Sequence, residues 1–279
     1  MTTSLEVEDH TIAGGFRKWG PLPSSFFSFS SDSSTFIERS LSRRVLFRGM
    51  SDMEKNPPQI PKTTCVVFDC DGVLVNAVSS WRTLHDHFGT DNAFNLQRFI
   101  RGEITDDEFM RSDIRMWKAI QNPITRDELF RAYSGVKLME GTRDVVEQLQ
   151  ANGVFVAIVS AGVDLFVASI ASMLKVDDWI ANGFVFNDDD TLSDDGVCRL
   201  HAVGKGEVIL RLLKMNGLNA KNCVSVGDSE MDLSMHVDGS RFIGFNPTRD
   251  SSIQAFESAD IDVVHGKDLR ASLPYRSLE

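Results

Sequence analysis

Short apolar runs alternate with longer amphipathic segments over most of the chain. The apolar runs lack polar residues at alternate positions, which is typical of strands buried on both faces of a sheet. In the amphipathic segments, apolar residues recur three and four positions apart, which predicts helices. Strands are predicted over 65–68, 154–160, 222–226, 242–245 and 261–264, and the segment 179–187 leads toward a hairpin. Because strands and helices alternate, we predict an α/β fold with a doubly wound parallel sheet.

The first two predicted strands are separated by residues 69–153, whereas a parallel crossover needs only a dozen or so residues. Thr105 and Thr125 each precede acidic residues, which signals a helix N-terminus. We therefore predict that residues 77–135 form a small helical cap inserted after the first strand, where it could exclude water and select a substrate. The alternative is a helical appendage unrelated to any site. The helices predicted in the cap are 79–88, 92–101, 105–120 and 125–133.

Beyond the cap, helices are predicted over 141–151 and 165–174, and over 205–215 after Gly204. The three aspartates at 188–190 predict a solvent-exposed turn, since they lack the spacing of a calcium loop. A β-hairpin is expected near Asp195 and Gly196.

The beginning of the chain has a different composition. Serine is concentrated in residues 21–42 without a helical or strand period. Serine and arginine are typical of an organelle transit peptide, whereas Glu6, Glu8 and Asp9 are not. Met50 is also a possible start of its own. We expect residues 1–60 to be a disordered extension or a targeting segment, and 61–76 together with 136–279 to form the α/β core.

The composition narrows the class of protein. A net charge of -11 speaks against non-specific nucleic-acid binding, which needs a basic face. No apolar run approaches the roughly 20 residues that span a bilayer, so we do not expect an integral membrane protein. The four cysteines have no paired metal-ligand spacing, which favours free thiols in a reducing compartment. We predict a cytoplasmic protein, or an organellar one if residues 1–49 are a transit peptide.

Polar residues follow the ends of three predicted strands. Asp69 and Asp71 come directly after the first, and two such carboxylates repel each other unless a cation lies between them. Mg²⁺ is the usual cation when a phosphate is nearby. Ligands in doubly wound sheets bind outside the carboxyl ends of the strands, so we expect one shared rim. The residues placed there, at strand ends or a helix start, are Asp69, Asp71, Ser160, Lys205, Asp228 and Asp232.

Four motifs, in order along the chain, resemble those of the haloacid-dehalogenase-like (HAD) superfamily. They are Asp69-Cys70-Asp71-Gly72-Val73-Leu74, Ser160-Ala161-Gly162, Lys205, and Gly227-Asp228-Ser229-Glu230-Met231-Asp232. Lys205-Gly206-Glu207, Val226-Gly227-Asp228, the Asn246-Pro247 step and the helical cap are most similar to the phosphoserine-phosphatase-like branch. Within this branch, Ser79-Ser80-Trp81 and Leu273-Pro274-Tyr275 resemble the archaeal type. The resemblance covers about residues 63–275 and implies a HAD-like α/β core with a cap. It also implies a Mg²⁺-dependent phosphatase that acts on a small phosphorylated metabolite.

The resemblance further implies a role for each motif residue. Asp69 would attack phosphorus to form an aspartyl phosphate, and Asp71 would protonate the leaving oxygen and then activate water. Dehalogenase members lack an acid at the second position, so Asp71 favours phosphate chemistry. The phosphoryl oxygens would be bound by Ser160, Ala161, Gly162 and Lys205. Mg²⁺ would be bound by the Asp69 carboxylate, the Asp71 carbonyl and Asp228, with Asp232 either as a further ligand or as a residue that orients the ligands.

The positions that would select the substrate depart from the branch. Phosphoserine phosphatases typically carry a cap glutamate nine residues after the nucleophile, where this chain has Val78, and a cap arginine where it has Asp113. Arg111 is two residues away and is the candidate for substrate contact. Phosphoserine is therefore a family-level expectation, and a sugar phosphate or phosphoglycolate-type ester is the alternative. A catalytically silent HAD-fold binding module and a phospho-accepting receiver domain, which is far shorter, are the interpretations from other classes.

Overall fold

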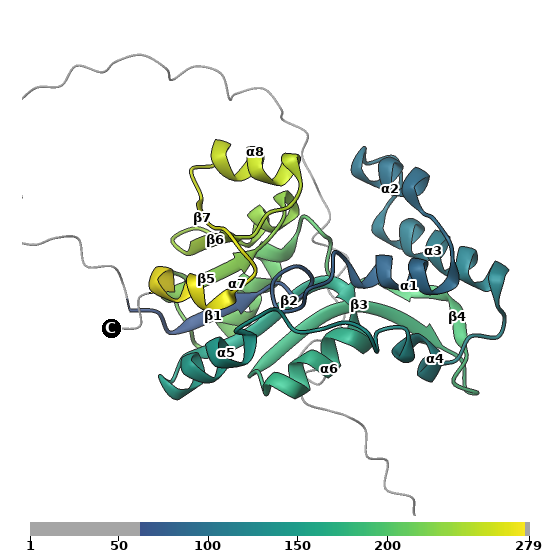
Figure 1. Cartoon of the computed structure of the whole chain (residues 1–279), viewed down its shortest axis with the longest axis horizontal. Coiled ribbons are helices and arrows are strands. Elements are labelled where there is room, and N and C mark those ends of the chain that lie inside the picture. Colours follow the sequence, from purple (N-terminus) through teal and green to yellow (C-terminus); the bar gives the residue numbers. More distant parts are fainter. Residues whose placement is uncertain (1–61, 277–279) are drawn as a thin grey trace, which may run out of the picture.

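The computed structural model describes residues 62–276 and centres on one seven-stranded sheet in the order β4-β3-β2-β1-β5-β6-β7 (Figure 1). Every neighbouring pair is parallel except β3 and β4, which are antiparallel. This confirms the predicted doubly wound α/β fold. The expected disordered or targeting segment over 1–60 lies outside the described residues. The strands are β1 (Cys65–Phe68), β2 (Phe155–Val163), β3 (Asp178–Phe186), β4 (Leu192–Val197), β5 (Cys223–Gly227), β6 (Arg241–Phe245) and β7 (Asp262–Val264).

Helices cover both faces of this sheet. Val66 and Phe68 of β1 pack in one hydrophobic cluster with α5 (Thr142–Ala151) and α6 (Asp164–Leu174). Cys65 and Val67 point to the opposite face and pack in a second cluster with α7 (Lys205–Met215) and α8 (Asp250–Ser258). Because both faces of β1 are covered, its sequence is an unbroken apolar run. Short 3₁₀ segments complete the core at η2 (Ala220–Asn222), η3 (Glu230–Met235) and η4 (Leu269–Arg276).

Five helices lie between β1 and β2 in the chain, and the first four of them gather beside β4 in Figure 1. Thr105 and Glu108 form a capping box, which agrees with the predicted helix start. Trp117 is fully buried and stacks with Trp81 and Phe88, so the helices share an aromatic core. The extent of the cap, 77–135, stays a prediction. The four helices beside β4 are α1 (Ser80–Phe88), α2 (Ala93–Ile100), α3 (Asp106–Ile120) and α4 (Arg126–Arg131).

The hairpin expected near Asp195 and Gly196 is present as the antiparallel pair β3–β4, but these residues do not form its turn. Both residues lie inside β4, and the chain turns instead over residues 187–191, through the three exposed aspartates at 188–190. Gly196 has a different reason for being a glycine: a Cβ there would lie 3.0 Å from the Cβ of Met110 on α3. The Asp-Gly pair therefore marks close packing of α3 against β4.

Ion pairs also join α3 to the β3–β4 hairpin. Arg111 Nε lies 2.6 Å from Asp195 Oδ1, and Lys118 Nζ lies 2.5 Å from Asp194 Oδ1. Exposed pairs of this kind contribute only about 0–1 kcal/mol each. Because both ion pairs join α3 to β4, the longest helix of the cap packs against the β3–β4 hairpin.

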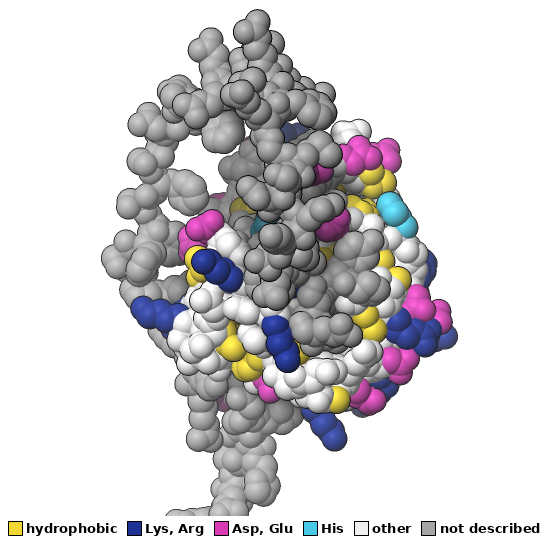
Figure 2. Space-filling view, turned by 90° about the vertical axis from the view of Figure 1, so that its left-hand side faces the viewer, with side chains coloured by type: hydrophobic (Ala, Val, Ile, Leu, Met, Phe, Trp, Pro, Cys, Tyr) yellow, Lys and Arg dark blue, Asp and Glu magenta, His cyan; other side chains and the backbone are white. Residues whose placement is uncertain are grey.

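Within the described part of the chain, no helix has both the length and the apolar character needed to cross a bilayer. On the face shown in Figure 2, the described Lys and Arg side chains stand among acidic and apolar ones and do not gather in one patch. The described part of this face therefore offers no concentrated basic surface.

Candidate active site

The carboxyl ends of β1, β2 and β5 lie side by side at the centre of the sheet. The parallel register places Phe68 of β1 beside Ile158 of β2 and Val226 of β5. Asp69 continues this register, since its N–H donates to the Val226 carbonyl over 2.9 Å. The segments that follow these strands therefore share one rim of the sheet. These are the segments that carry the predicted site residues.

A buried lysine joins two of the predicted carboxylates. Lys205, the first residue of α7, is 3% exposed, and its Nζ lies 2.9 Å from Asp69 Oδ1 and 2.6 Å from Asp232 Oδ1. Burial alone would lower the pKa of Lys205, but the two carboxylates outweigh it and hold that pKa well above its usual range. The side chain is therefore a permanent ammonium at the centre of the rim.

Carboxyl groups outnumber this ammonium. Burial raises the pKa of Asp69 to about 7 against the opposing effect of Lys205, and Asp232 adds to the increase. Burial, together with the charges of Asp232 and Asp69, raises the pKa of Asp228 to about 8. A further positive charge is therefore needed to keep all of these groups ionised at neutral pH.

Asp228 and Asp232 are held in different ways. Asp232 Oδ2 accepts hydrogen bonds from the N–H groups of Asp228 and Ser229 and from the Ser229 hydroxyl, while Oδ1 accepts one from Lys205. The Asp228 carboxylate makes no hydrogen bond with the described residues. One carboxylate oxygen from each of Asp69, Asp228 and Asp232 lies within 4.8 Å of the other two. Asp232 thus fixes the turn after β5, and Asp228 keeps both oxygens available to a ligand.

Gly72 turns the first motif back against Asp228. Its φ is +75°, and a Cβ at this position would lie 2.4 Å from Asp228 Oδ2. A larger residue is excluded by backbone conformation and by space. The main chain that follows Asp71 is thereby brought against the Asp228 carboxylate, which agrees with the expected use of the Asp71 carbonyl as a ligand.

Asp71 is held by a cap residue that sequence reasoning did not assign to the site. Ser80 is fully buried, and its N–H and hydroxyl donate to Asp71 Oδ2 over 2.8 and 2.7 Å. These two hydrogen bonds oppose the burial that raises the pKa of Asp71. Asp71 Oδ1 is also buried and has no hydrogen-bond partner among the described residues. Ser80 therefore fixes one carboxyl oxygen and leaves the other for a ligand.

The same end of α1 is fastened to the end of β2. The Ser80 hydroxyl accepts the Val163 N–H over 2.9 Å, and the Trp81 indole N–H donates to the Ala161 carbonyl over 3.0 Å. Ser79 is the ordinary helix cap, since its side chain accepts the N–H of Arg82. Ser79-Ser80-Trp81 marks the resemblance to the archaeal type, but a serine pair at a helix start is also compatible with capping alone. The contact of the second serine with Asp71 is therefore visible only in the structure.

The Ser160-Ala161-Gly162 segment borders Asp71. β2 runs to Val163, beyond its predicted end, and its pairing with β3 is irregular after Ser160. The Gly162 N–H donates to Ser160 Oγ over 3.1 Å. A Cβ on Gly162 would lie 2.8 Å from Asp71 Oδ2 and 3.2 Å from Ser160 Oγ. The predicted phosphate-binding segment and the predicted acid are therefore neighbours.

The donor set at this rim fits a hard divalent cation. The clustered carboxylate oxygens of Asp69, Asp228 and Asp232 are the ligands that Mg²⁺ prefers. A cation would also relieve the charge excess expressed in the raised pKa values of Asp69 and Asp228. The chemistry of the donors and the electrostatics of the rim therefore agree with Mg²⁺.

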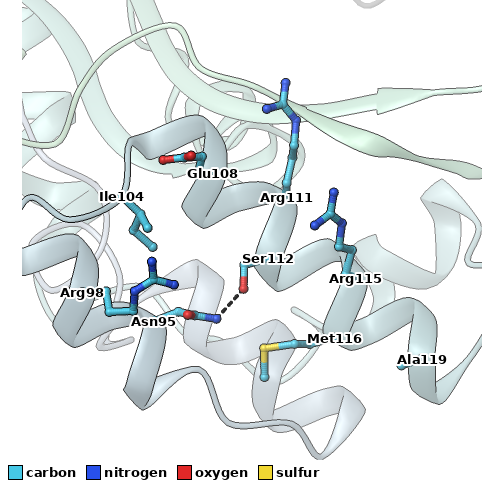
Figure 3. Close-up of a pocket in the computed structure, with 9 residues that line it drawn as sticks. All are labelled: Asn95, Arg98, Ile104, Glu108, Arg111, Ser112, Arg115, Met116 and Ala119. Atoms are coloured by element: carbon cyan, nitrogen blue, oxygen red, sulfur yellow. Dashed lines mark hydrogen bonds between the residues drawn. The ribbon is translucent and has the colours of Figure 1, made fainter.

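Arg111, the predicted substrate contact, lines a different cavity. Figure 3 shows it in a cap pocket of about 690 Å³, among residues that all come from α2, α3 and the loop between these helices. Its guanidinium pairs with Asp195 on β4. The pocket contains none of the rim residues, so these contacts place Arg111 with the hairpin rather than beside Asp69 or Lys205. A role in substrate binding stays a prediction.

Asp113, which stands where the branch has an arginine, is turned into the cap. It is 1% exposed, its Oδ1 lies 3.2 Å from His85 Nε2, and it accepts hydrogen bonds from the Asn92 amide. Val78, at the position of the branch glutamate, is 71% exposed and offers no charge. Neither position therefore provides the charged group that the branch uses for its substrate.

The chain is similar to known proteins over the region that contains this rim. The family model for haloacid dehalogenase-like hydrolases matches residues 66–236. The phosphoserine phosphatase of Methanocaldococcus jannaschii is 26% identical over 215 residues, which cover 77% of this chain and 98% of that protein. The phosphoserine phosphatase of Archaeoglobus fulgidus is 28% identical over 182 residues, which cover 65% of this chain and 52% of that protein. Among solved structures, a phospho-aspartyl intermediate analogue of phosphoserine phosphatase aligns with a TM-score of 0.63 and 25% identity, over 77% of this chain and 99% of that one.

The electrostatics of the rim predict how Mg²⁺ stabilises the protein. Asp69 and Asp228 lose their protons near pH 7 and 8 when folded, but near pH 4 when unfolded. Between about pH 4 and about pH 8, the folded protein without metal therefore binds more protons than the unfolded chain. Over this range the stability of the metal-free protein falls as pH rises. Mg²⁺ binds the ionised groups, so we expect it to raise the melting temperature more at pH 8 than at pH 6.

Thermal melts at both pH values, with saturating Mg²⁺ or with EDTA, measure this difference. Asp228→Asn removes the group with the higher pKa and should reduce the difference, whereas Asp188→Asn in the exposed turn should leave it unchanged. An equal or smaller Mg²⁺ effect at pH 8 would contradict the prediction.

Proposed function

Because the chain belongs to the haloacid dehalogenase-like hydrolase family and to its phosphoserine-phosphatase-like branch, we propose that it hydrolyses the phosphate ester of a small metabolite through an aspartyl phosphate on Asp69. Membership of this branch makes the chain a phosphatase. The observation that carries the proposal is the buried Asp69–Lys205–Asp232 cluster at the strand ends, with Asp71 two residues beyond the nucleophile.

Asp69 is the proposed nucleophile. Lys205 lies 2.9 Å from its Oδ1 and favours the ionised form, which is the form that attacks phosphorus. Attack forms a bond from the carboxylate oxygen to phosphorus as the bond to the alcohol oxygen breaks. The proposed ligands of the phosphoryl oxygens, whose charge must be stabilised during transfer, are the Lys205 ammonium, the Ser160 hydroxyl and the Ser160-Ala161-Gly162 backbone.

Asp71 is the proposed acid and base. Its Oδ1 is free of hydrogen bonds to described residues, while Ser80 holds Oδ2. Burial raises the pKa of Asp71, which favours the protonated form needed to donate to the leaving alcohol. The carboxylate that remains then removes a proton from the water that hydrolyses the aspartyl phosphate.

The metal site is proposed to take Mg²⁺, with Asp69, the Asp71 carbonyl and Asp228 as ligands and Asp232 as the residue that orients the turn. When bound, Mg²⁺ would supply positive charge that stabilises the phosphoryl oxygens. Asp232 already accepts four hydrogen bonds, from Lys205, Ser229 and the Asp228 N–H. This supports an orienting role over direct ligation.

Phosphoserine is the substrate suggested by the names of the relatives. Val78 and the buried Asp113 supply neither of the charges that the branch uses to hold the amino and carboxylate groups. This favours a small ester without an amino-acid backbone, such as a sugar phosphate or a phosphoglycolate-type ester. Because every motif residue is present, a catalytically silent module is the weaker interpretation. We place the activity in the cytoplasm, or in an organelle if residues 1–49 are a transit peptide.

We expect release of inorganic phosphate from an aryl phosphate to require Mg²⁺ and to stop in the presence of EDTA. Asp69→Asn should lower turnover by at least about a thousandfold, because it removes the nucleophile while keeping the shape of the side chain. Asp188→Asn is the control for loss of one carboxylate. Activity in Asp69→Asn near the wild-type level would overturn the nucleophile assignment.

Ser80→Ala should impair the acid more than the fold. We expect kcat/KM to fall about 10–100-fold for an alkyl phosphate, whose leaving group needs a proton, and much less for a nitrophenyl phosphate. Ser79→Ala removes the neighbouring helix cap and should change kcat/KM for both esters by the same factor. If Ser80→Ala also lowers kcat/KM for both esters by the same factor, Ser80 has only a structural role.

A panel of small esters measures the substrate preference. We expect kcat/KM for phosphoserine to be lower than for at least one ester of similar size whose alcohol part is uncharged or acidic. Val78→Glu restores the acid used by the branch. It should raise kcat/KM for phosphoserine relative to kcat/KM for the ester that the wild-type protein prefers, whereas Val78→Gln should not. A wild-type preference for phosphoserine over the whole panel would contradict this prediction.

A further inference from the structure

A second cluster of potential metal ligands lies away from the rim, where the start of α3 meets the loop that follows β4. Asp106, Cys198 and His201 each offer one donor atom, and the three atoms lie within 4.8 Å of one another. His201 Nδ1 is 2.7 Å from Asp106 Oδ2 and 4.0 Å from Cys198 Sγ. Asp106 comes from the cap, whereas Cys198 and His201 follow the hairpin. The cluster therefore joins two distant parts of the chain.

The loop that carries the sulfur and the nitrogen is held by a buried amide. Asn182 of β3 is 4% exposed, and its Oδ1 accepts the N–H groups of Arg199 and Leu200 over 2.8 and 3.0 Å. Its Nδ2 donates to the Leu200 carbonyl over 2.9 Å. The two residues between Cys198 and His201 are thereby fixed, so the loop presents its donors in one arrangement before any ligand binds.

We propose that Asp106, Cys198 and His201 form a binding site for Zn²⁺ or a similar borderline transition-metal ion, separate from the Mg²⁺ site. A thiolate, an imidazole and a carboxylate are ligands that Zn²⁺ accepts together, whereas Mg²⁺ selects oxygen. The thiolate and the carboxylate would neutralise the two charges of the ion. Three protein ligands leave the fourth position of a tetrahedral site to water.

The present distances are close to those of such a site. Bond lengths of about 2.3 Å to sulfur and about 2.0 Å to nitrogen and oxygen place sulfur and nitrogen about 3.5 Å apart, and nitrogen and oxygen about 3.3 Å apart. Each observed separation is within about 1 Å of these values, with the nitrogen and oxygen too close because they are hydrogen-bonded. The His201 side chain is 45% exposed, which gives an ion access and leaves room for the ring to move.

A reactive thiol explains Cys198 less well. Burial and the charges of Asp106 and Asp107 raise the pKa of Cys198 to about 12, so the thiol is protonated and a poor nucleophile at neutral pH. A metal ion would displace this proton. The bound ion would also tie the first turn of α3 to the core, beyond the exposed pairs that α3 makes with β4.

Titration with Co²⁺ tests the site without using enzyme activity. The reduced, metal-free protein is titrated with Co²⁺ while excess Mg²⁺ occupies the carboxylate rim. We expect one equivalent to produce the near-ultraviolet charge-transfer band of a cobalt–thiolate bond and the visible bands of a tetrahedral ion, and Zn²⁺ to displace it. The absence of a charge-transfer band would overturn the proposal.

Matched variants identify the ligands. Cys198→Ser should abolish the charge-transfer band, and Asp106→Asn should weaken Co²⁺ binding by more than about tenfold, since even changes outside the ligand shell cost that much. Asp107→Asn removes an exposed carboxylate from the same helical turn and should weaken binding far less than Asp106→Asn, because Asp107 acts on the site only through its charge. A charge-transfer band that persists in Cys198→Ser would show that the metal binds elsewhere. If Asp106→Asn and Asp107→Asn weaken Co²⁺ binding equally, Asp106 contributes only surface charge and is not a ligand. Either result would contradict the proposed site.

Discussion

The contact of one buried ammonium with two carboxylates organises the rim of this sheet. Lys205 begins α7, Asp69 follows β1, and Asp232 lies in the turn after β5, so three separate segments must converge for any of the charges to be compensated. An unpaired buried charge costs several kcal/mol, which makes this convergence a condition of folding. The same contact favours the ionised form of Asp69. One interaction thus serves both the stability of the core and the proposed chemistry.

The cluster remains short of positive charge, and this links metal binding to the fold. Asp228 stands against Gly72 without a hydrogen bond to described residues, and burial raises its pKa. A cation at this point would complete the neutralisation that Lys205 begins. Residues that would bind the metal and residues that hold the strand ends together therefore form one electrostatic unit.

The cap takes part in the site through the first turn of α1. Ser80 holds Asp71 Oδ2 and accepts the N–H of Val163, and the Tyr133 hydroxyl donates to the Ser80 carbonyl over 3.2 Å. The orientation of the proposed acid therefore depends on α1 being docked against the end of β2. At its other side the cap rests on the β3–β4 hairpin. A change in cap position would alter Asp71 as well as access to the rim.

The parts predicted correctly from the sequence are those with a local cause. Buried strands are continuous apolar runs, and the rule that ligands bind at the carboxyl ends of parallel strands was enough to place Asp69, Lys205 and Asp228 on one rim. Features that depend on contacts between distant segments were missed. The Asp195-Gly196 pair is typical of a turn, and the packing of Gly196 against α3 leaves no trace in the sequence. Ser80 is likewise compatible with a helix cap, and its contact with Asp71 is not visible from the sequence. The short helix α8 was also missed, since its few apolar positions give no clear period.

Asp113 and Cys198 illustrate the same limit. A carboxylate at a cap position could face a substrate or the interior, and only the contacts with His85 and Asn92 show that it faces the interior. Cys198 has no second cysteine at a metal-ligand spacing, and Asp106 reaches it from the cap, so the three potential ligands are not recognised together along the chain.

The central claim is that the Asp69 carboxylate becomes phosphorylated during turnover. Its most direct test is to quench the Mg²⁺-loaded protein with acid during steady-state turnover and to locate the phosphoryl group by peptide mass spectrometry. The account predicts a phosphoryl group on Asp69, in the peptide that follows β1. Efficient phosphate release with no phosphorylated carboxylate, and with inversion at a chiral phosphorus as direct attack by water requires, would contradict it, because two successive displacements give net retention.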